Sequence, residues 1–99
     1  MEDEPTTQIE FYVEPDGTVH IHRHAVSEDD VAEVLDNKPE TRKEADGSQI
    51  ALGMTLDGRF LRVVYLPNQE SGTIFVITAF EPGRTTKRGW RRRQRRKKS

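Results

Sequence analysis

The residues most suited to chemistry lie in a dense basic block near the C-terminus. Ten of the fifteen residues from 84 to 98 are Lys or Arg, and the only Trp of the chain lies among them. Cations at this density neutralise phosphates, and an aromatic ring offers a surface on which an unpaired base can stack. The sequence therefore predicts a nucleic-acid-binding segment made of Arg84, Lys87, Arg88, Trp90, Arg91, Arg92, Arg93, Arg95 and Arg96. The alternatives are a disordered solubilising tail and a tail folded back on an acidic body.

Three histidines, His20, His22 and His24, alternate along a segment that is typical of a strand, so we expect them on one face. Two of them could share a metal with a third ligand from elsewhere, but all three span too far for one ion. We therefore predict no metal and no cofactor. Histidine titrates near neutrality, which suits the proton transfers of RNA cleavage. His24 is the preferred catalytic candidate, because it borders the start of a predicted helix. The alternative is a structural, hydrogen-bonded histidine.

Two arginines of the preceding chain are further catalytic candidates. A guanidinium can brace a phosphorane transition state, which gains negative charge. Arg59 follows an Asp-Gly turn, and Arg62 lies in the middle of a predicted strand. The alternative is that both form ordinary ion pairs with Glu10, Glu14 or Glu81. The sequence contains no Gly-rich phosphate loop.

Charge is divided unevenly along the chain. Its 99 residues, 33% charged and 32% hydrophobic, suffice for one domain with a modest core. All seventeen acidic residues lie before residue 82 with only six basic ones, a net charge of −11, whereas residues 84 to 98 carry +10. There is no Cys, which excludes disulfides and thiolate metal sites. The acidic N-terminus lacks an apolar signal core and no apolar run approaches ~18 residues, so we expect a cytoplasmic protein with no membrane partner.

Short strands and one helix must position these residues. Apolar residues alternate or run on over 8–14, 18–23, 49–55, 59–66 and 73–80, which predicts five strands. The last of these is apolar on both faces, as is typical of a central strand. The turn at 15–17 predicts a hairpin between the first two strands, and 39–47 is expected to be a polar connection. Ser27 as N-cap, with Asp30 three residues later, predicts a helix at about 28–36.

The sequence thus predicts an α+β fold, in which an antiparallel sheet of four to five strands carries one short helix packed on a face. Short turns between the last three strands favour an antiparallel meander. We expect a disordered acidic N-terminus at 1–7, one domain at 8–83 and a basic segment at 84–99. Within that segment we expect a short helix near 85–93, anchored on the sheet by Trp90, and then a frayed end.

Several short motifs follow one another in a recognisable order, namely His24-Ala25-Val26-Ser27, Gly53, Asp57-Gly58-Arg59, Val63-Val64-Tyr65, Ile77-Thr78-Ala79, Lys87-Arg88 and Trp90. Over residues 19–90 this order resembles the BrnT-type toxins and a neighbouring uncharacterised family, both within the RelE/ParE-like toxin superfamily. The resemblance implies a small RelE-like, ribonuclease-like domain that a cognate antitoxin neutralises. Phe80 stands where BrnT toxins commonly have a basic residue, and a Pro-Asp-Gly hairpin replaces their Trp-Asp opening. Both departures bring the chain closer to the uncharacterised neighbour.

Together these observations predict a type II toxin-like protein that interacts with RNA, free or at the ribosome, and binds a cognate antitoxin protein. A metal-independent endoribonuclease of this kind would draw its catalytic residues from His24, Arg59, Arg62, Lys87 and Arg88. The alternative is a non-catalytic nucleic-acid- or ribosome-binding module that uses the same basic segment. A third hypothesis is an interaction protein whose basic segment pairs with an acidic partner.

Overall fold

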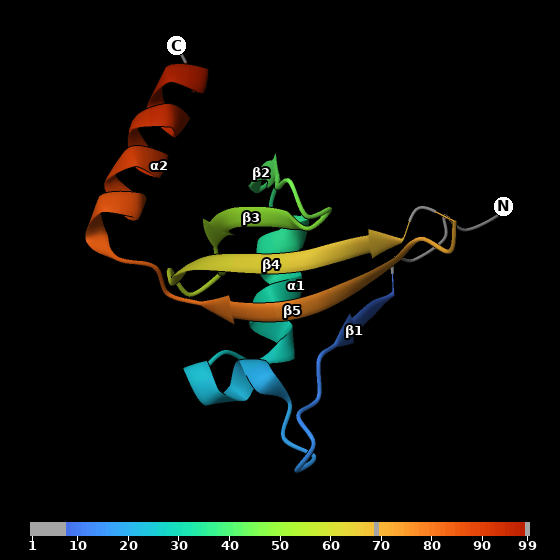
Figure 1. Ribbon diagram of the computed structural model, residues 1–99. Helices are drawn as coiled ribbons and strands as arrows, with labels where there is room; N and C mark the ends of the chain where they lie inside the picture. The colour runs from blue at the N-terminus through green and yellow to red at the C-terminus, as the bar shows by residue number, and fades with distance from the viewer. Residues whose placement is uncertain (1–7, 69, 99) are drawn as a thin grey trace, which may run out of the picture.

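The computed structural model describes residues 8–68 and 70–98, so the predicted disorder at 1–7 lies outside the described residues. Five strands and two α-helices form an α+β fold, as predicted, and a short 3₁₀ helix precedes the first α-helix (Figure 1). In chain order the elements are β1 (Ile9–Phe11), η1 (His20–His24), α1 (Glu28–Asp36), β2 (Glu40–Lys43), β3 (Gln49–Met54), β4 (Phe60–Asn68), β5 (Thr73–Phe80) and α2 (Arg84–Lys98).

The strands form one sheet with the order β1-β5-β4-β3-β2. Strands β3, β4 and β5 make the predicted antiparallel meander, with β4 in the middle of the sheet. Strand β5 has neighbours on both sides, as its apolar faces predict, because β1 pairs with its first half. That pairing is parallel, so the sheet is mixed rather than purely antiparallel.

The predicted hairpin between 8–14 and 18–23 forms only next to its turn, and the two long strands predicted for it are wrong. The first strand shortens to β1, only the bridge between Val13 and Val19 survives of the pairing, and the second segment becomes η1. The reason is tertiary, because β1 pairs with β5 instead and Ile21 turns into the core, where it is 1% exposed. Ala25 ends η1 with a left-handed φ of 58°, which redirects the chain into α1.

The polar connection predicted at 39–47 is also wrong in part, because residues 40–43 form the edge strand β2. This strand pairs antiparallel with β3 through the main chain, and three of its four residues are exposed. An edge strand that buries neither face shows no apolar alternation, so hydrophobic periodicity cannot predict it.

The first helix agrees with its prediction from end to end. The Ser27 side chain accepts a hydrogen bond from the Asp30 N–H at 3.0 Å, and the Asp30 carboxylate accepts one from the Ser27 N–H at 3.1 Å. This capping box satisfies two N–H groups that the helix would leave unpaired. Helix α1 then buries Val31 and Val34 on the sheet. Gly53 of β3 permits the close approach, since a Cβ there would lie 3.3 Å from Val34 Cγ1.

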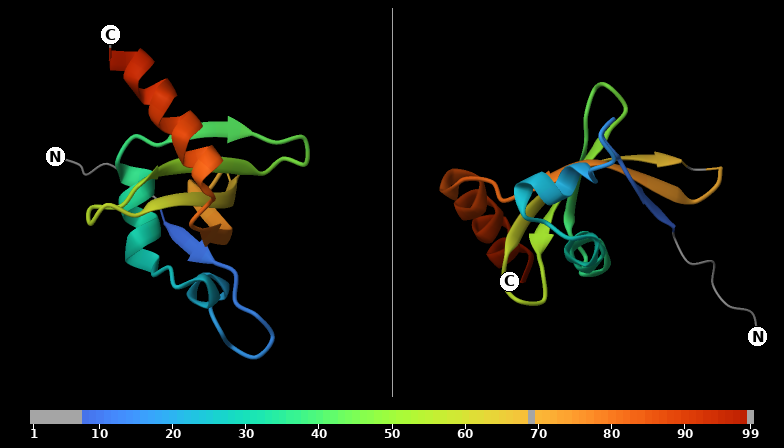
Figure 2. Two further views of the ribbon diagram at one scale, coloured as in Figure 1. Left: turned by 90° about the vertical axis from the view of Figure 1, so that its left-hand side faces the viewer. Right: turned by 90° about the horizontal axis from the view of Figure 1, so that it is seen from below.

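The two α-helices lie on opposite faces of the sheet, as the two views of Figure 2 show. The main core lies under α1 and includes Val31, Leu61, Val63 and Val76. A smaller cluster of Ile50, Leu52 and Phe60 lies on the other face, where Trp90 of α2 packs on it. The C-terminal helix reaches Lys98, so it is longer than the predicted 85–93. No described helix has the length and apolar character needed to cross a bilayer.

Candidate nucleic-acid interface

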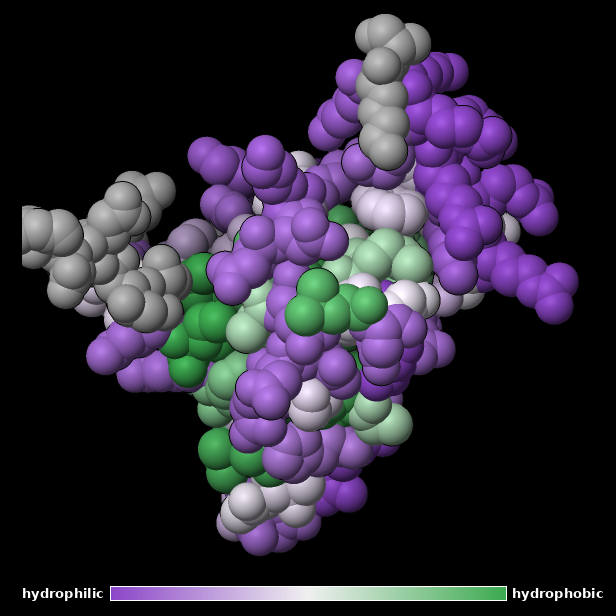
Figure 3. Space-filling model, turned by 180° about the vertical axis from the view of Figure 1, so that it is seen from behind, coloured by the Kyte–Doolittle hydropathy of each residue, from purple (hydrophilic) through white to green (hydrophobic). Residues whose placement is uncertain are grey.

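Helix α2 has two opposite stripes, which follow from the helical period. Positions 84, 87, 88, 91 and 95 are three or four residues apart, so they fall on one side, whereas 86, 90 and 93 fall on the other. We call the first the outer stripe (Arg84, Lys87, Arg88, Arg91 and Arg95) and the second the inner stripe (Thr86, Trp90 and Arg93). The structure brings the outer stripe around one hollow of about 280 Å³. Figure 3 shows α2 as a strongly hydrophilic projection from the body.

The inner stripe holds the helix to the sheet. The Trp90 ring lies 4.9 Å from that of Phe60, centroid to centroid, which confirms that Trp90 anchors the helix. Arg93 donates two hydrogen bonds to the Glu40 carboxylate, from Nε at 2.6 Å and from Nη2 at 2.8 Å. The Arg93 guanidinium holds the pKa of Glu40 below its ordinary value. One of the predicted alternatives, a basic segment folded back on the acidic body, therefore applies to the inner stripe.

Trp90 and Arg93 are thus occupied within the protein, whereas the outer-stripe side chains form no hydrogen bond or ion pair with the residues that the structure describes. The Trp90 face that packs on Phe60 is not free for a base, so we do not retain Trp90 or Arg93 in the proposed nucleic-acid surface. A Cβ at Gly89 would lie 3.3 Å from Nη1 of Arg93, so a larger residue there would require the guanidinium to shift by a few tenths of an ångström.

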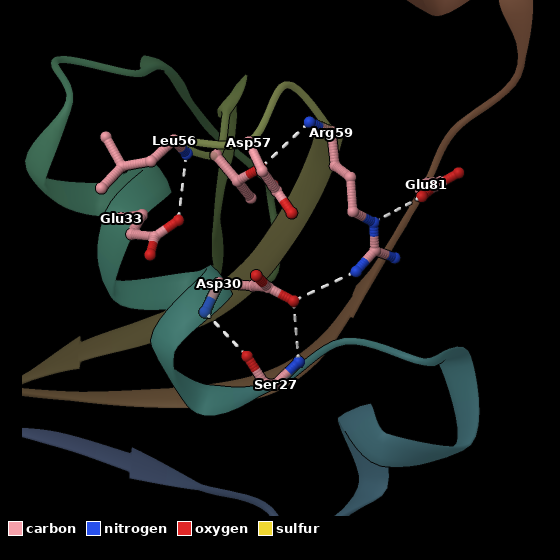
Figure 4. A network of polar contacts seen from close by, with 8 residues as sticks. Ser27, Asp30, Glu33, Leu56, Asp57, Arg59 and Glu81 are labelled. Atoms are coloured by element: carbon pink, nitrogen blue, oxygen red, sulfur yellow. Dashed lines mark hydrogen bonds and ion pairs between the residues drawn. The ribbon is translucent and has the colours of Figure 1, made fainter.

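Arg59, a predicted catalytic residue, lies in a network of carboxylates (Figure 4). Its Nε donates to Glu81 at 2.7 Å and its Nη1 to Asp30 at 3.1 Å. The hydrogen bond to Glu81, helped by the charge of Asp30, raises the pKa of Arg59 above its ordinary value. The predicted alternative of an ion pair with Glu81 is confirmed. Two carboxylates compensate this guanidinium, so it offers little charge to a phosphate.

The three histidines do not line one face of a strand, because η1 replaces that strand. His20 Nδ1 lies 2.7 Å from the Glu14 carboxylate, and His22 Nε2 lies 2.8 Å from that of Glu28. The His24 ring lies 5.2 Å from the His20 ring and 6.0 Å from that of Phe80, both measured between centroids. The structure therefore places His24 in an aromatic group at the end of β5, on a different element from Lys87 and Arg88.

Arg62 lies on the sheet face that α2 covers, beside Phe60 and Val64 on β4. Its Nε atom is buried and has no hydrogen-bond partner in the part of the chain that the structure describes. The structure does not bring the five candidate catalytic residues together. Arg59 lies among carboxylates, His24 lies among aromatic rings, and Arg62 lies under the inner side of α2. Lys87 and Arg88 lie on the outer stripe, on the opposite side of α2 from Arg62.

One carboxylate cluster was not predicted. Asp30, Glu33 and Asp57 have oxygens within 4.8 Å of one another. Each has a partner in the protein: Asp30 binds Arg59, Glu33 accepts from the Leu56 N–H at 3.0 Å, and Asp57 accepts from the Thr55 hydroxyl. These bonds fasten the turn between β3 and β4 to α1, which accounts for the cluster structurally.

Two residues that meet the inner side of α2, Glu40 and Arg42, were not predicted. Both belong to β2, which periodicity could not predict. The sequence signal for them was the alternation of charge in an otherwise polar connection.

Three kinds of comparison bear on family membership. No protein-family model, curated protein or solved structure matches the chain. The resemblance to BrnT-type and RelE-like toxins therefore stays a prediction.

Proposed function

We propose that the protein binds RNA through the outer stripe of α2. The observation that carries this proposal is the contrast between the two sides of one helix. The inner stripe finds its partners within the protein, whereas Arg84, Lys87, Arg88, Arg91 and Arg95 gather around a hollow open to solvent. Helix α2 contains no acidic residue, so nothing within it neutralises that stripe.

The dimensions of the stripe suit a polyanion. Arg95 follows Arg84 by eleven positions, a rise of about 16 Å along the helix, so the cations of the stripe can meet successive phosphates of one strand. Packing five like charges on one side of a helix is unfavourable without a counter-charge, and a phosphate backbone supplies one. Because phosphate contacts carry no sequence information, we expect affinity without strong sequence preference.

The negative charge of the rest of the chain also favours RNA binding at α2, because it limits where RNA can lie. Residues before 82 carry a net charge of −11, and the acids of the first turn of α1 are exposed or half-exposed. A polyanion is repelled by that surface and attracted by α2. The complex therefore orients RNA along one helix.

The test is the salt dependence of binding to a single-stranded RNA oligonucleotide. We expect log K to fall linearly with log salt concentration, and the double variant Arg88→Gln/Arg91→Gln to reduce that slope by about 1.4, since each phosphate contact on a single strand contributes about 0.7. The matched control is Lys38→Gln/Lys43→Gln, which removes two cations from the body and should leave the slope nearly unchanged. Equal slopes for both variants would contradict the proposal, as would tighter binding to an acidic polypeptide than to RNA.

The same binding reactions also test the endoribonuclease prediction, when the RNA is examined for cleavage after incubation. If the protein only binds, the RNA stays intact, and Arg59→Ala keeps full affinity because Arg59 lies in the carboxylate network. Cleavage products that disappear with Lys87→Gln or Arg88→Gln would instead support the toxin-like enzyme. Binding of single-stranded DNA with equal affinity would broaden the ligand to nucleic acids in general.

A further inference from the structure

A second hollow lies between the inner side of α2 and the sheet. Its volume is about 180 Å³, and its polar lining consists of Arg42, Arg62, Arg93, Thr85 and Thr86. These residues come from β2, β4 and α2, so only the folded chain brings them together. Ile50 and Leu52 of β3 add apolar lining. We call this hollow the arginine pocket.

The charge of the arginine pocket is positive. Three guanidinium groups line it, and the nearby Glu40 carboxylate compensates chiefly Arg93, which it binds through two nitrogens. A wider hollow of about 420 Å³ on the other side of Arg62 contains Glu44 and Asp46. Those two acids disfavour an anion there, so an anion attracted by Arg62 is directed to the side under α2.

Arg62 has an unmet hydrogen-bonding requirement. Its Nε is one of three buried side-chain polar atoms that have no partner among the described residues, and the others are Thr78 Oγ1 and Trp90 Nε1. All three residues belong to the face that α2 covers, because Val64 pairs with Thr78 in the register of β4 and β5 and Trp90 packs on the same face. A buried donor on a charged group without an acceptor costs free energy, which a bound anion would recover.

The start of α2 adds donors to the same pocket. Thr85 and Thr86 lie in the first turn of a 15-residue helix, where backbone N–H groups lack helical acceptors and the helix dipole favours negative charge. Their hydroxyls are further donors. Guanidinium groups, hydroxyl groups and the backbone N–H groups of a helix N-terminus are the hydrogen-bond donors that proteins use to bind phosphate.

We propose that the arginine pocket binds a phosphomonoester dianion, the terminal phosphate of a nucleotide or of an RNA chain. The pocket lies between a sheet and a helix, so a chain end enters it more readily than a strand that continues in both directions. The outer stripe, which is open, suits the continuing strand. The two sites lie on opposite sides of α2, so this inference does not depend on RNA binding to the outer stripe.

Trp90, the only Trp of the chain, packs on the cluster that contains Ile50 and Leu52 of the pocket lining, so its fluorescence serves as a reporter of the pocket. The full chain is titrated with inorganic phosphate, adenosine 5′-monophosphate and adenosine, at constant ionic strength. We expect saturable changes with the first two and none with adenosine. Arg62→Met, which keeps an apolar stem over the sheet, should weaken phosphate binding about tenfold or more, since it removes a charged hydrogen bond. Lys38→Met, the control, removes an exposed cation that lies outside both hollows of α2, and it should bind phosphate like the original chain.

A second pocket variant distinguishes a loss of phosphate binding from a loss of folding. Arg42 is exposed on the edge strand, so Arg42→Met leaves the core intact and should also weaken phosphate binding. Oligonucleotides with a 5′-phosphate or a 5′-hydroxyl separate the two sources, because only the phosphorylated one should displace adenosine 5′-monophosphate. Equal phosphate affinity in Arg62→Met, Arg42→Met and Lys38→Met would overturn the proposal. Unchanged Trp90 emission together with no heat of phosphate binding in calorimetry would overturn it as well.

Discussion

The two faces of the sheet differ in how completely their polar groups are satisfied. Under α1, apolar side chains such as Val31 and Leu61 are fully buried, and the charged groups at the rim, Arg59 among them, have partners (Figure 4). Under α2, the apolar cluster is smaller, and it lies beside Arg62, Thr78 and Trp90, each with a buried polar atom that has no partner within the described residues. Native proteins rarely leave such groups unpaired. The α1 face thus combines a well-packed core with paired polar groups, whereas the unpaired groups of the α2 face support the proposal that this face binds an anion.

The largest expected effect tests the α1 face. Leu61 is fully buried in the main core, so Leu61→Ala should lower the free energy of unfolding by about 3 kcal/mol, within the usual range for a core leucine. Urea denaturation followed by far-UV circular dichroism measures it. Leu66→Ala is the control, because Leu66 lies on the same strand at 40% exposure and should cost far less. Similar losses for the two variants would remove the distinction on which the comparison depends.

The corresponding change on the α2 face should cost less and act locally. Trp90 is only partly buried, so Trp90→Ala should lower the free energy of unfolding by about 2 kcal/mol, below the value for a fully buried Trp. The helical signal of α2 should weaken at 222 nm as the helix detaches, while the sheet remains. Trp90→Phe should preserve most of the packing on Phe60. A loss as large as that of Leu61→Ala would show that the α2 face belongs to the main core.

The start of α1 is held by side-chain hydrogen bonds, whereas no such cap is present at the start of α2 among the described residues. Helix α1 is stabilised by its capping box, so Ser27→Ala should cost about 1 kcal/mol, whereas Ser27→Gly should cost only a few tenths. Thermal denaturation at a fixed scan rate measures both. No difference between the alanine and glycine variants would mean that packing alone defines the start of α1.

The smallest expected effect is a pH dependence of the α2 attachment. Arg93 lowers the pKa of Glu40 in the folded state, so this ion pair stabilises the fold above the ordinary Glu pKa of 4.5. The contribution is lost as the pH falls through the lower, folded-state pKa. Trp90 emission between pH 6 and pH 3 should therefore shift towards that of an exposed indole. Glu40→Gln should show less of this pH dependence, and identical curves for both proteins would contradict the assignment.

The basic segment shows how far the sequence analysis of the candidate site could go. Its density of cations predicted a nucleic-acid surface, but their division into two stripes depends on which side meets the sheet. Trp90 and Arg93 belong to the inner stripe because Phe60 and Glu40 lie there. Arg59, a predicted catalytic residue, has Asp30 and Glu81 as partners, which lie 29 and 22 residues away in the sequence.

Interactions between neighbouring residues were sufficient to predict α1, the meander of β3, β4 and β5, and the α+β class. Caps, turns and apolar periodicity act within a few residues, so they can be recognised in the order of the amino acids. The pairing of β1 with β5, the edge strand β2 and the arginine pocket depend instead on contacts between distant segments. Such contacts form only where burial of the whole sheet outweighs local preference, as it does when Ile21 leaves its predicted strand for the core.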